Sequence, residues 1–127
     1  MEITASAGVV QARQLARALA QECRFSLVEQ TKLITAASEL ARNTLIHGGG
    51  GTMTARLVDE RGRRGVRLVF SDDGPGIPDV ELALTDGWTS GGGMGLGLSG
   101  SRRLVDDFVL DTTPRQGTTV TITKWAR

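Results

Sequence analysis

The chain has 127 residues, and 15 Lys and Arg against 14 Asp and Glu give a net charge of +1. This length fits a single domain over residues 1–127 that can bury its own hydrophobic core. A near-neutral charge and few aromatic residues argue against nucleic-acid binding. No apolar run reaches the roughly 18 residues of a membrane span. One cysteine, Cys23, excludes an internal disulfide, and no signal peptide is visible, so we expect a cytoplasmic protein.

Glycine is the unusual component of this composition. Of the 17 glycines, 13 lie in three short windows: residues 48–51, the pair Gly74 and Gly76, and residues 87–100. A flexible linker would gather glycines in one low-complexity stretch. Three windows between periodic segments instead suggest loops that approach one ligand.

The first half of the chain predicts an edge strand, two helices and a hairpin. Residues 2–5 favour a short edge strand, and residues 7–24 place Val9, Ala12, Leu15, Ala16, Leu19 and Cys23 on one helical face. Ser26 and Glu29 have the spacing of a capping box, so a second helix begins there, and Gly48 ends it. Alternating apolar residues predict strands at 52–57 and 66–71 around a polar turn at 59–65.

The second half predicts loops, helices and a closing hairpin. A loop over 72–78 precedes a short helix at 79–84, a mobile glycine-rich loop at 87–93 and a helix over about 95–107. Strands at 108–112 and 118–125 form the last hairpin. This order predicts an α+β fold: a two-layer sandwich of a mixed, mainly antiparallel sheet with helices on one face.

Three polar residues on the second helix form the first candidate site. Glu39, Asn43 and His47 are spaced by four residues, which puts them on one helical face. A carboxylate beside a carboxamide suits a general base next to a Mg²⁺ ligand. A solvated polar face is the alternative interpretation. We expect His47 to cap the helix rather than bind metal, because the chain has no second His.

Two of the three glycine windows form the other candidate sites. The run from Asp72 to Ile77 follows a strand, where an aspartate can accept from a ligand amine and glycines let backbone approach a flat ring. A plain turn is the alternative there. Residues 91–100 open a helix whose backbone N–H groups can cradle an anion. This is not a Rossmann motif, because no strand directly precedes residues 91–100 and no βαβ unit follows, and it is not a Walker A motif, because Gly-Lys-Ser/Thr does not occur.

Together these windows resemble the GHKL (Bergerat-fold) ATP-binding superfamily. Its motifs correspond here to the N box Glu39 and Asn43, the G1 box Asp72-x-Gly74-x-Gly76, the G2 box Gly93-x-Gly95-x-Gly97, and the late Gly117-Thr118. Within the superfamily the chain is most similar to the anti-sigma-type serine/threonine kinases, and among them to the RsbT-type switch kinases. The segments ITAASELARN, DERGRRG and TKWAR carry that closer resemblance.

The resemblance implies ATP and Mg²⁺ as cofactors and a role for each motif residue. Glu39 would be the general base toward a partner's serine, and Asn43 would coordinate Mg²⁺. Asp72, supported by Thr118, would accept from the adenine amine. The adenine side would include Gly74, Gly76 and Ile77. The triphosphate side would include Gly93, Met94, Gly95, Leu96, Gly97 and Leu98, under a lid at residues 87–92.

The same resemblance implies a partner-switching, stressosome-like pathway. The substrates would be STAS-domain proteins, and the released kinase would activate a PP2C-type phosphatase. Residues 87–90 hold no lid arginine, although Arg102 or Arg103 could replace one. That departure favours the alternative of a nucleotide-binding anti-sigma factor, binding a sigma factor with little kinase activity. A detached histidine-kinase catalytic domain is a weaker alternative. The role of Trp88, as lid anchor or partner contact, and homodimerisation stay open.

Overall fold

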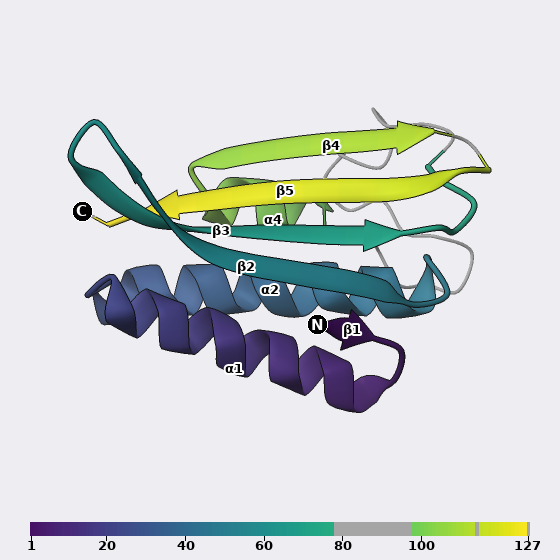
Figure 1. Ribbon diagram of the computed structural model, residues 1–127, viewed down its shortest axis with the longest axis horizontal. Coiled ribbons are helices and arrows are strands. Elements are labelled where there is room, and N and C mark those ends of the chain that lie inside the picture. The colour runs from purple at the N-terminus through teal and green to yellow at the C-terminus, as the bar shows by residue number, and fades with distance from the viewer. Residues whose placement is uncertain (78–97, 114, 127) are drawn as a thin grey trace.

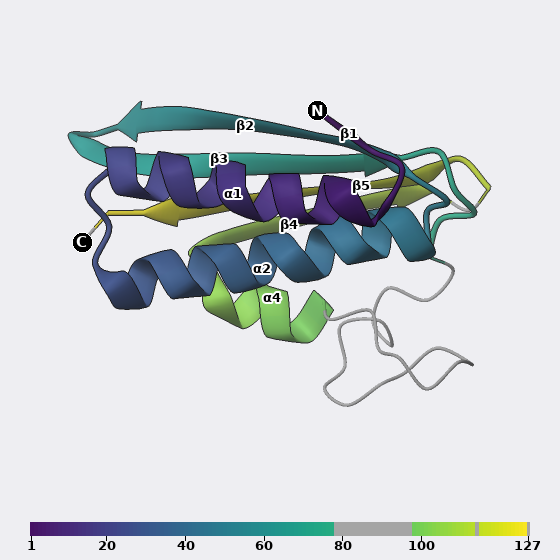
Figure 2. The ribbon, with the colours of Figure 1, turned by 90° about the horizontal axis from the view of Figure 1, so that it is seen from below.

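The computed structural model describes residues 1–77, 98–113 and 115–126. In chain order its elements are β1 (Glu2–Ile3), α1 (Ser6–Glu22), α2 (Leu27–Ile46), β2 (Gly51–Glu60), β3 (Arg63–Asp72), α4 (Leu98–Leu104), β4 (Asp107–Thr113) and β5 (Gly117–Trp125). The strands form one sheet in the order β1-β2-β3-β5-β4 (Figure 1). The three helices lie on one face of it (Figure 2). The predicted two-layer α+β fold is confirmed, with every described strand pair antiparallel.

Small residues bring α1 close to the rest of the fold. Its buried positions are Gly8, Ala12, Ala16 and Ala20, one every four residues. Such a stripe follows one helical face and lets a neighbouring backbone approach. The predicted inner face also contained Leu15, which is 36% exposed. That assignment was wrong, because the alanine stripe occupies the face toward the core and Leu15 falls beside it.

The ends of α2 agree with the sequence signals. The Ser26 hydroxyl accepts a hydrogen bond from the Glu29 N–H at 3.1 Å, as expected of an N-cap. At the other end His47 is the C-cap, and its N–H donates to the Asn43 carbonyl at 2.9 Å. The predicted capping position of His47 is therefore confirmed. The chain then turns through Gly48 into β2.

The β2–β3 hairpin is longer than its sequence suggested. The strands stay paired as far as Glu60 and Arg63, so the turn consists of Arg61 and Gly62 rather than residues 59–65. Both turn residues have positive φ, 54° and 76°. This is the backbone conformation of a two-residue primed turn, which fits the twist of an antiparallel pair. Polarity alone marked too wide a turn, because β2 ends and β3 begins with charged residues.

The helix predicted at about 95–107 ends earlier than expected. In the described residues α4 runs from Leu98 to Leu104, and β4 begins at Asp107. The Trp125 backbone N–H donates to Asp106 at 2.7 Å, and the Trp125 indole N–H donates to Asp107 at 3.0 Å. These bonds hold both aspartates against β5, so they cannot continue the helix. The expected helix at 79–84 and loop at 87–93 lie outside the described residues.

The core lies between the sheet and the helices. Its fully buried large side chains include Met53, Leu68 and Ile122 from the sheet and Leu33 and Leu40 from α2. Cys23 is also buried there, as its position in the first helix predicted. No helix in the described part of the chain is long and apolar enough to cross a membrane. This packing places the second half of α2 against the end of β3.

Candidate nucleotide-binding site

The apolar face of the sheet ends in a row of polar side chains. Strand alternation puts Phe70 and Asp72 of β3 on the same face, toward the helices. Asp72 pairs across the sheet with Thr118 of β5, and Thr118 pairs with Thr112 of β4. A carboxylate and two hydroxyls therefore replace apolar residues two positions beyond the last core residues of these strands. This row borders a pocket.

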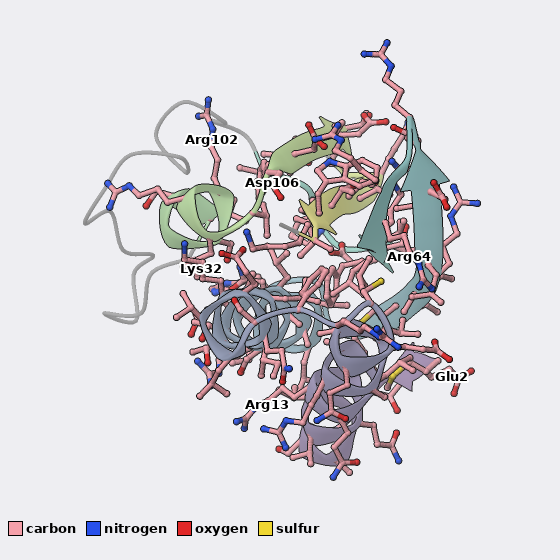
Figure 3. The ribbon with its side chains drawn as sticks, turned by 90° about the vertical axis from the view of Figure 1, so that its left-hand side faces the viewer. Glu2, Arg13, Lys32, Arg64, Arg102 and Asp106 are labelled. Atoms are coloured by element: carbon pink, nitrogen blue, oxygen red, sulfur yellow. The ribbon has the colours of Figure 1, made fainter. Side chains whose placement is uncertain are left out.

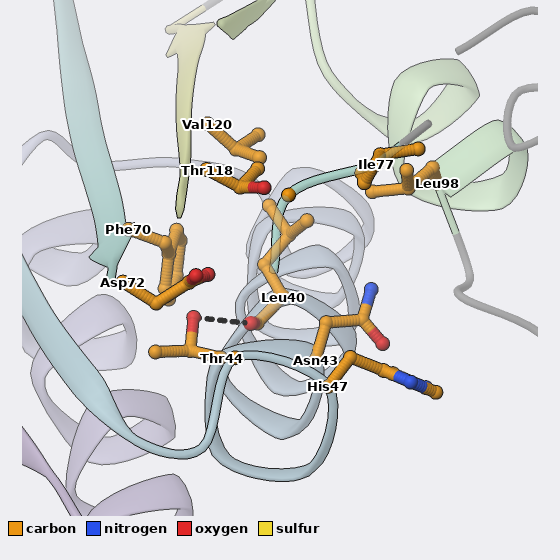
Figure 4. Close-up of a pocket in the computed structure, with 12 residues that line it drawn as sticks. Leu40, Asn43, Thr44, His47, Phe70, Asp72, Ile77, Leu98, Thr118 and Val120 are labelled. Carbon is orange, nitrogen blue, oxygen red and sulfur yellow. Dashed lines mark hydrogen bonds between the residues drawn. The ribbon is translucent and has the colours of Figure 1, made fainter. Parts of the chain in front are cut away.

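The pocket lies between α2, the sheet and α4. Most of its wall is apolar, with polar groups from α2 and the strand ends. Its described lining residues are Leu40, Asn43, Thr44, His47, Gly48, Phe70, Asp72, Gly76, Ile77, Leu98, Thr118 and Val120. Figure 4 shows the Asp72 carboxylate and the Thr118 hydroxyl facing the interior from neighbouring strands. A mostly apolar pocket with a few convergent polar groups is typical of a small-molecule site.

Three glycines allow the close packing around Asp72. The Gly74 N–H donates to Asp72 Oδ1 at 2.9 Å. A Cβ on Gly48 would lie 2.6 Å from Asp72 Oδ2, and one on Gly74 would lie 2.8 Å from the Gly48 Cα. Gly117 has φ of +110°, and a side chain there would overlap the Asp72 carbonyl oxygen. Backbone from three segments thus fixes the carboxylate at the end of the pocket.

The structure gives a role to a glycine that the sequence left unexplained. Gly48 belongs to the first glycine window, for which only a helix end and a turn were expected. It lines the pocket and contacts the Asp72 side chain. Its position directly after the motif helix was the available signal, but 24 positions separate Gly48 from Asp72 in the sequence, and only the folded chain brings them together.

Most of the predicted site residues that are described meet at this pocket. Asn43, Asp72, Gly76, Ile77, Leu98 and Thr118 line it, and Gly74 contacts Asp72. His47 lines it as well, one turn beyond Asn43 on the same helix. The predicted triphosphate residues Gly93, Met94, Gly95, Leu96 and Gly97 lie outside the described residues. The expected lid at 87–92 and Trp88 lie outside them too.

Glu39 lies one helical turn before Asn43 and away from the described pocket lining. Its carboxylate is 3.2 Å from the Arg42 guanidinium, and the side chains of Arg42 and Glu39 are 43% and 37% exposed. An ion pair this exposed contributes little to stability. Because the Glu39 side chain is this exposed, both solvent and a partner protein can reach its carboxylate. Its placement is compatible with a base that meets a protein substrate at the surface.

The oxygen donors at the pocket suit a metal ion that takes most of its ligands from a bound nucleotide and water. Within the described residues no group of three His, Cys, Asp or Glu could hold a metal ion. Asn43 offers an amide oxygen at the pocket wall. Mg²⁺ commonly takes one or two protein oxygens and completes its shell with phosphate and water. The residues present fit a magnesium ion bound together with a triphosphate.

Arg102 and Arg103 lie in the last turn of α4. Both side chains are exposed. Figure 3 shows Arg102 extending outward from α4, away from the sheet. The described structure therefore shows no contact of Arg102 with the pocket lining, and the replacement of a lid arginine stays a prediction.

Comparison with known families agrees with this geometry. The family model of histidine kinase-, DNA gyrase B-, and HSP90-like ATPases matches residues 28–127. The chain belongs to this family of ATPases. The match covers α2, which carries the N-box residues, and every strand of the sheet except β1. It confirms the resemblance drawn from the sequence motifs.

Individual known proteins give a more specific relationship than the family does. The chain is 42% identical over 119 residues to the serine/threonine-protein kinase RsbT of Bacillus subtilis (strain 168), covering 94% of this chain and 90% of RsbT. It is 32% identical over 105 residues to the anti-sigma F factor of Bacillus licheniformis, covering 76% of this chain and 69% of that factor. The higher identity and coverage favour the kinase relationship.

A solved structure shares the fold. The catalytic domain of the histidine kinase ThkA superposes with a TM-score of 0.57 at 17% sequence identity. The alignment covers 98% of this chain and 93% of the ThkA chain. At this identity the likeness shows the fold alone.

Proposed function

We propose that this protein is an ATP-dependent serine/threonine kinase of a bacterial partner-switching, stressosome-like pathway. Its substrates would be STAS-domain proteins, and after release it would bind and activate a PP2C-type phosphatase. The order of groups along α2 and the turn that follows it carries this proposal. Gly48, just beyond the end of α2, contacts the Asp72 carboxylate. Asn43 lies five residues back on the helix, and Glu39 lies one turn before Asn43.

This order matches the shape of an extended nucleotide. Gly48 and Glu39 are nine positions apart, which corresponds to about 13.5 Å at the rise of an α-helix. A purine with its amine at Asp72 would direct its phosphates along the helix past Asn43. The terminal phosphate would then approach Glu39, whose carboxylate is open to a protein partner. The apolar wall formed by Leu40, Ile77 and Val120 suits the flat ring.

Phosphoryl transfer from ATP depends more on positioning the hydroxyl and the γ-phosphate than on a covalent intermediate with the enzyme. Glu39 would accept the proton of a partner's serine or threonine hydroxyl as its oxygen bonds to the γ-phosphorus. The bond from that phosphorus to the bridging oxygen breaks, and ADP leaves. Asn43 would hold the magnesium ion, which neutralises part of the phosphate charge when bound. Asp72 and Thr118 would orient the base so that the phosphates point toward Glu39.

Nucleotide binding without efficient transfer is the second candidate function. The 32% identity to an anti-sigma F factor favours it, together with the missing lid arginine at residues 87–90. The protein would then act mainly as a switch that binds a sigma factor. Both candidates share the nucleotide pocket and differ in whether phosphate reaches a partner.

A transfer assay separates these candidates. Purified protein is incubated with Mg-ATP and a STAS-domain partner, and the partner's mass is measured by intact mass spectrometry. We expect one added phosphate on a serine or threonine, absent when Glu39 is replaced by glutamine. Equal phosphorylation by the wild type and Glu39→Gln would overturn the assigned base. ATP binding without any transfer would favour the switch protein.

A further inference from the structure

The Arg42 guanidinium on α2 lies beside the Glu39 carboxylate and faces solvent. Its Nη1 group donates to Glu39 Oε1 at 3.2 Å, and the side chains of Arg42 and Glu39 are 43% and 37% exposed. A guanidinium carries five N–H donors in a planar fork, and this bond uses one of them. The exposed remainder of the fork can therefore receive a second carboxylate while the bond to Glu39 stays in place.

The residues that share this strip of α2 suit a protein partner. Thr35 lies one turn before Glu39 and is exposed. Ile46 lies one turn after Arg42 and is 53% exposed. At about 100° per residue these four residues fall within about 60° of one another, and they extend over about 16 Å of helix. α2 packs between α1 and α4 with its buried residues toward the core, so the strip faces away from the sheet (Figure 2). Arginine is enriched in protein–protein interfaces, whose buried centre is more apolar than the rest of the surface.

The charges on this side of α2 favour an acidic partner segment. Lys32 lies two turns before Glu39 on the same helix, and Arg42 is the second cation. Glu29, the other carboxylate of α2, forms an ion pair with the buried Lys124. Two cations therefore accompany the single outward-facing carboxylate of the helix. Complementary charge brings an acidic segment to this surface and disfavours a basic one.

We propose that Arg42 recognises a carboxylate of the protein substrate and so places the neighbouring serine or threonine hydroxyl at Glu39. The substrate class is a protein with Asp or Glu beside its phosphoacceptor residue. A carboxylate bound to the exposed edge of the fork lies one side-chain width from Glu39, so the hydroxyl of an adjacent residue reaches the base. This inference rests on the proposed kinase function and adds a positioning residue to it.

Steady-state transfer kinetics distinguish this role from that of an ordinary surface ion pair. The probe is the STAS-domain partner of the transfer assay. The KM for this partner, kcat and ATP affinity are measured at low and high salt for the wild type, Arg42→Gln, Arg42→Lys and Arg56→Gln. Glutamine removes the charge, and lysine keeps the charge without the planar fork. Arg56 is exposed and pairs with Arg67 on the outer face of the sheet, so it is the matched control for loss of one positive charge.

The expected change is in the KM for the partner. Arg42→Gln should raise this KM roughly 10- to 100-fold, the value of a charge-assisted hydrogen bond, and leave ATP affinity unchanged. Arg42→Lys should have an intermediate KM, and Arg56→Gln should match the wild type. High salt should raise the wild-type KM and affect Arg42→Gln less, because salt screens the ion pair that this variant lacks. An ordinary surface pair would leave all these KM values unchanged.

Charge reversal on both proteins identifies the carboxylate of the partner. Each Asp and Glu next to the phosphoacceptor is replaced in turn by Lys, and each variant is tested with the wild-type kinase and with Arg42→Glu. One variant should be a poor substrate for the wild type and should gain at least ~10-fold in kcat/KM with Arg42→Glu, because the reversed charges restore a pair.

The contradicting outcomes fall on different claims. An unchanged partner KM in Arg42→Gln, or no charge-reversed partner that recovers with Arg42→Glu, overturns recognition by Arg42 and leaves the kinase function standing. A loss of kcat or ATP affinity at unchanged partner KM places Arg42 at the nucleotide phosphates and also overturns it. Absence of transfer by the wild type overturns the proposed function, and this inference with it, so the two failures are distinguishable.

Discussion

A buried ion cluster of Lys124, Glu29 and Asp106 joins the start of α2 to the end of β5. Its replacement gives a specific prediction about the free energy of unfolding. The Lys124 side chain is 3% exposed and forms an ion pair with Glu29, which is 12% exposed. Its ammonium is also 3.7 Å from Asp106. Lys124 lies opposite Val66 on the core face of the sheet, where an apolar side chain would be expected. The cluster is thus a charged replacement for part of the core.

Removing one member of the Lys124–Glu29 pair should lower the free energy of unfolding far more than replacing both members. Lys124→Met leaves the Glu29 carboxylate without its buried counter-ion, and loss of one member of a buried pair typically costs about 3–5 kcal/mol. We expect about 3 kcal/mol here, because Glu29 and Asp106 keep some contact with water. Glu29→Gln should cost a similar amount. The free energy of unfolding of the double variant, Lys124→Met with Glu29→Gln, should be closer to the wild-type value than that of either single variant.

Urea unfolding followed by tryptophan fluorescence measures these effects. With slopes of about 1–3 kcal/mol per molar for small proteins, each single variant should lower the midpoint by roughly 1–3 M. Arg42→Met is the control, because it breaks the exposed pair with Glu39 and should cost less than about 1 kcal/mol. Single variants that behave like Arg42→Met would refute the reasoning, and so would a double variant whose loss equals the sum of the two.

Three smaller predictions follow from the packing. Gly48→Ala should lower ATP affinity at least ~10-fold by calorimetry, because its Cβ would lie 2.6 Å from Asp72 Oδ2; unchanged affinity would contradict the contact. Gly100→Ala should raise the free energy of unfolding by about 0.5–1 kcal/mol, since it is helical with open space around it; a loss would contradict this. Burial, opposed by Arg64 and reinforced by Glu22, raises the pKa of the Cys23 thiol. The folded state therefore keeps that proton to higher pH, so stability from Cys23 should be complete below the unfolded pKa and decline above it. A Cys23→Ala variant should lack this alkaline decline in urea titrations at several pH values.

The sequence predicted those parts of the fold that depend on local pattern. Alternation in β3 and β5 identified the strands and their core faces, because each residue's environment follows from period two. The Ser26 cap and Gly48 bounded α2 correctly for the same local reason. The hairpin turn was misplaced because charged residues at strand ends resemble loop residues, and only pairing such as Asp59 with Arg64 distinguishes them.

The site was predictable where its residues lie in short motifs. Asn43, Asp72 and Thr118 came from such motifs, and the fold brings them to one pocket. Residues that act through tertiary contact left no comparable signal. Gly48 was expected only to end a helix, and no sequence pattern marked the contacts of Thr112 or the ion pairs of Lys124. Their surroundings are set by segments 24 or more positions away, or by cross-strand neighbours that spacing alone does not specify.

Phosphoryl transfer with Glu39 replaced is the most direct test of the central claim. Single-turnover transfer from Mg-ATP to a STAS-domain partner is compared for the wild type and Glu39→Gln, with ATP affinity measured on the same samples. A general base contributes about 10²–10⁴-fold to the rate, so we predict that loss with ATP affinity within ~3-fold of the wild type. Transfer by Glu39→Gln at the wild-type rate, with ATP bound equally well, would contradict the account.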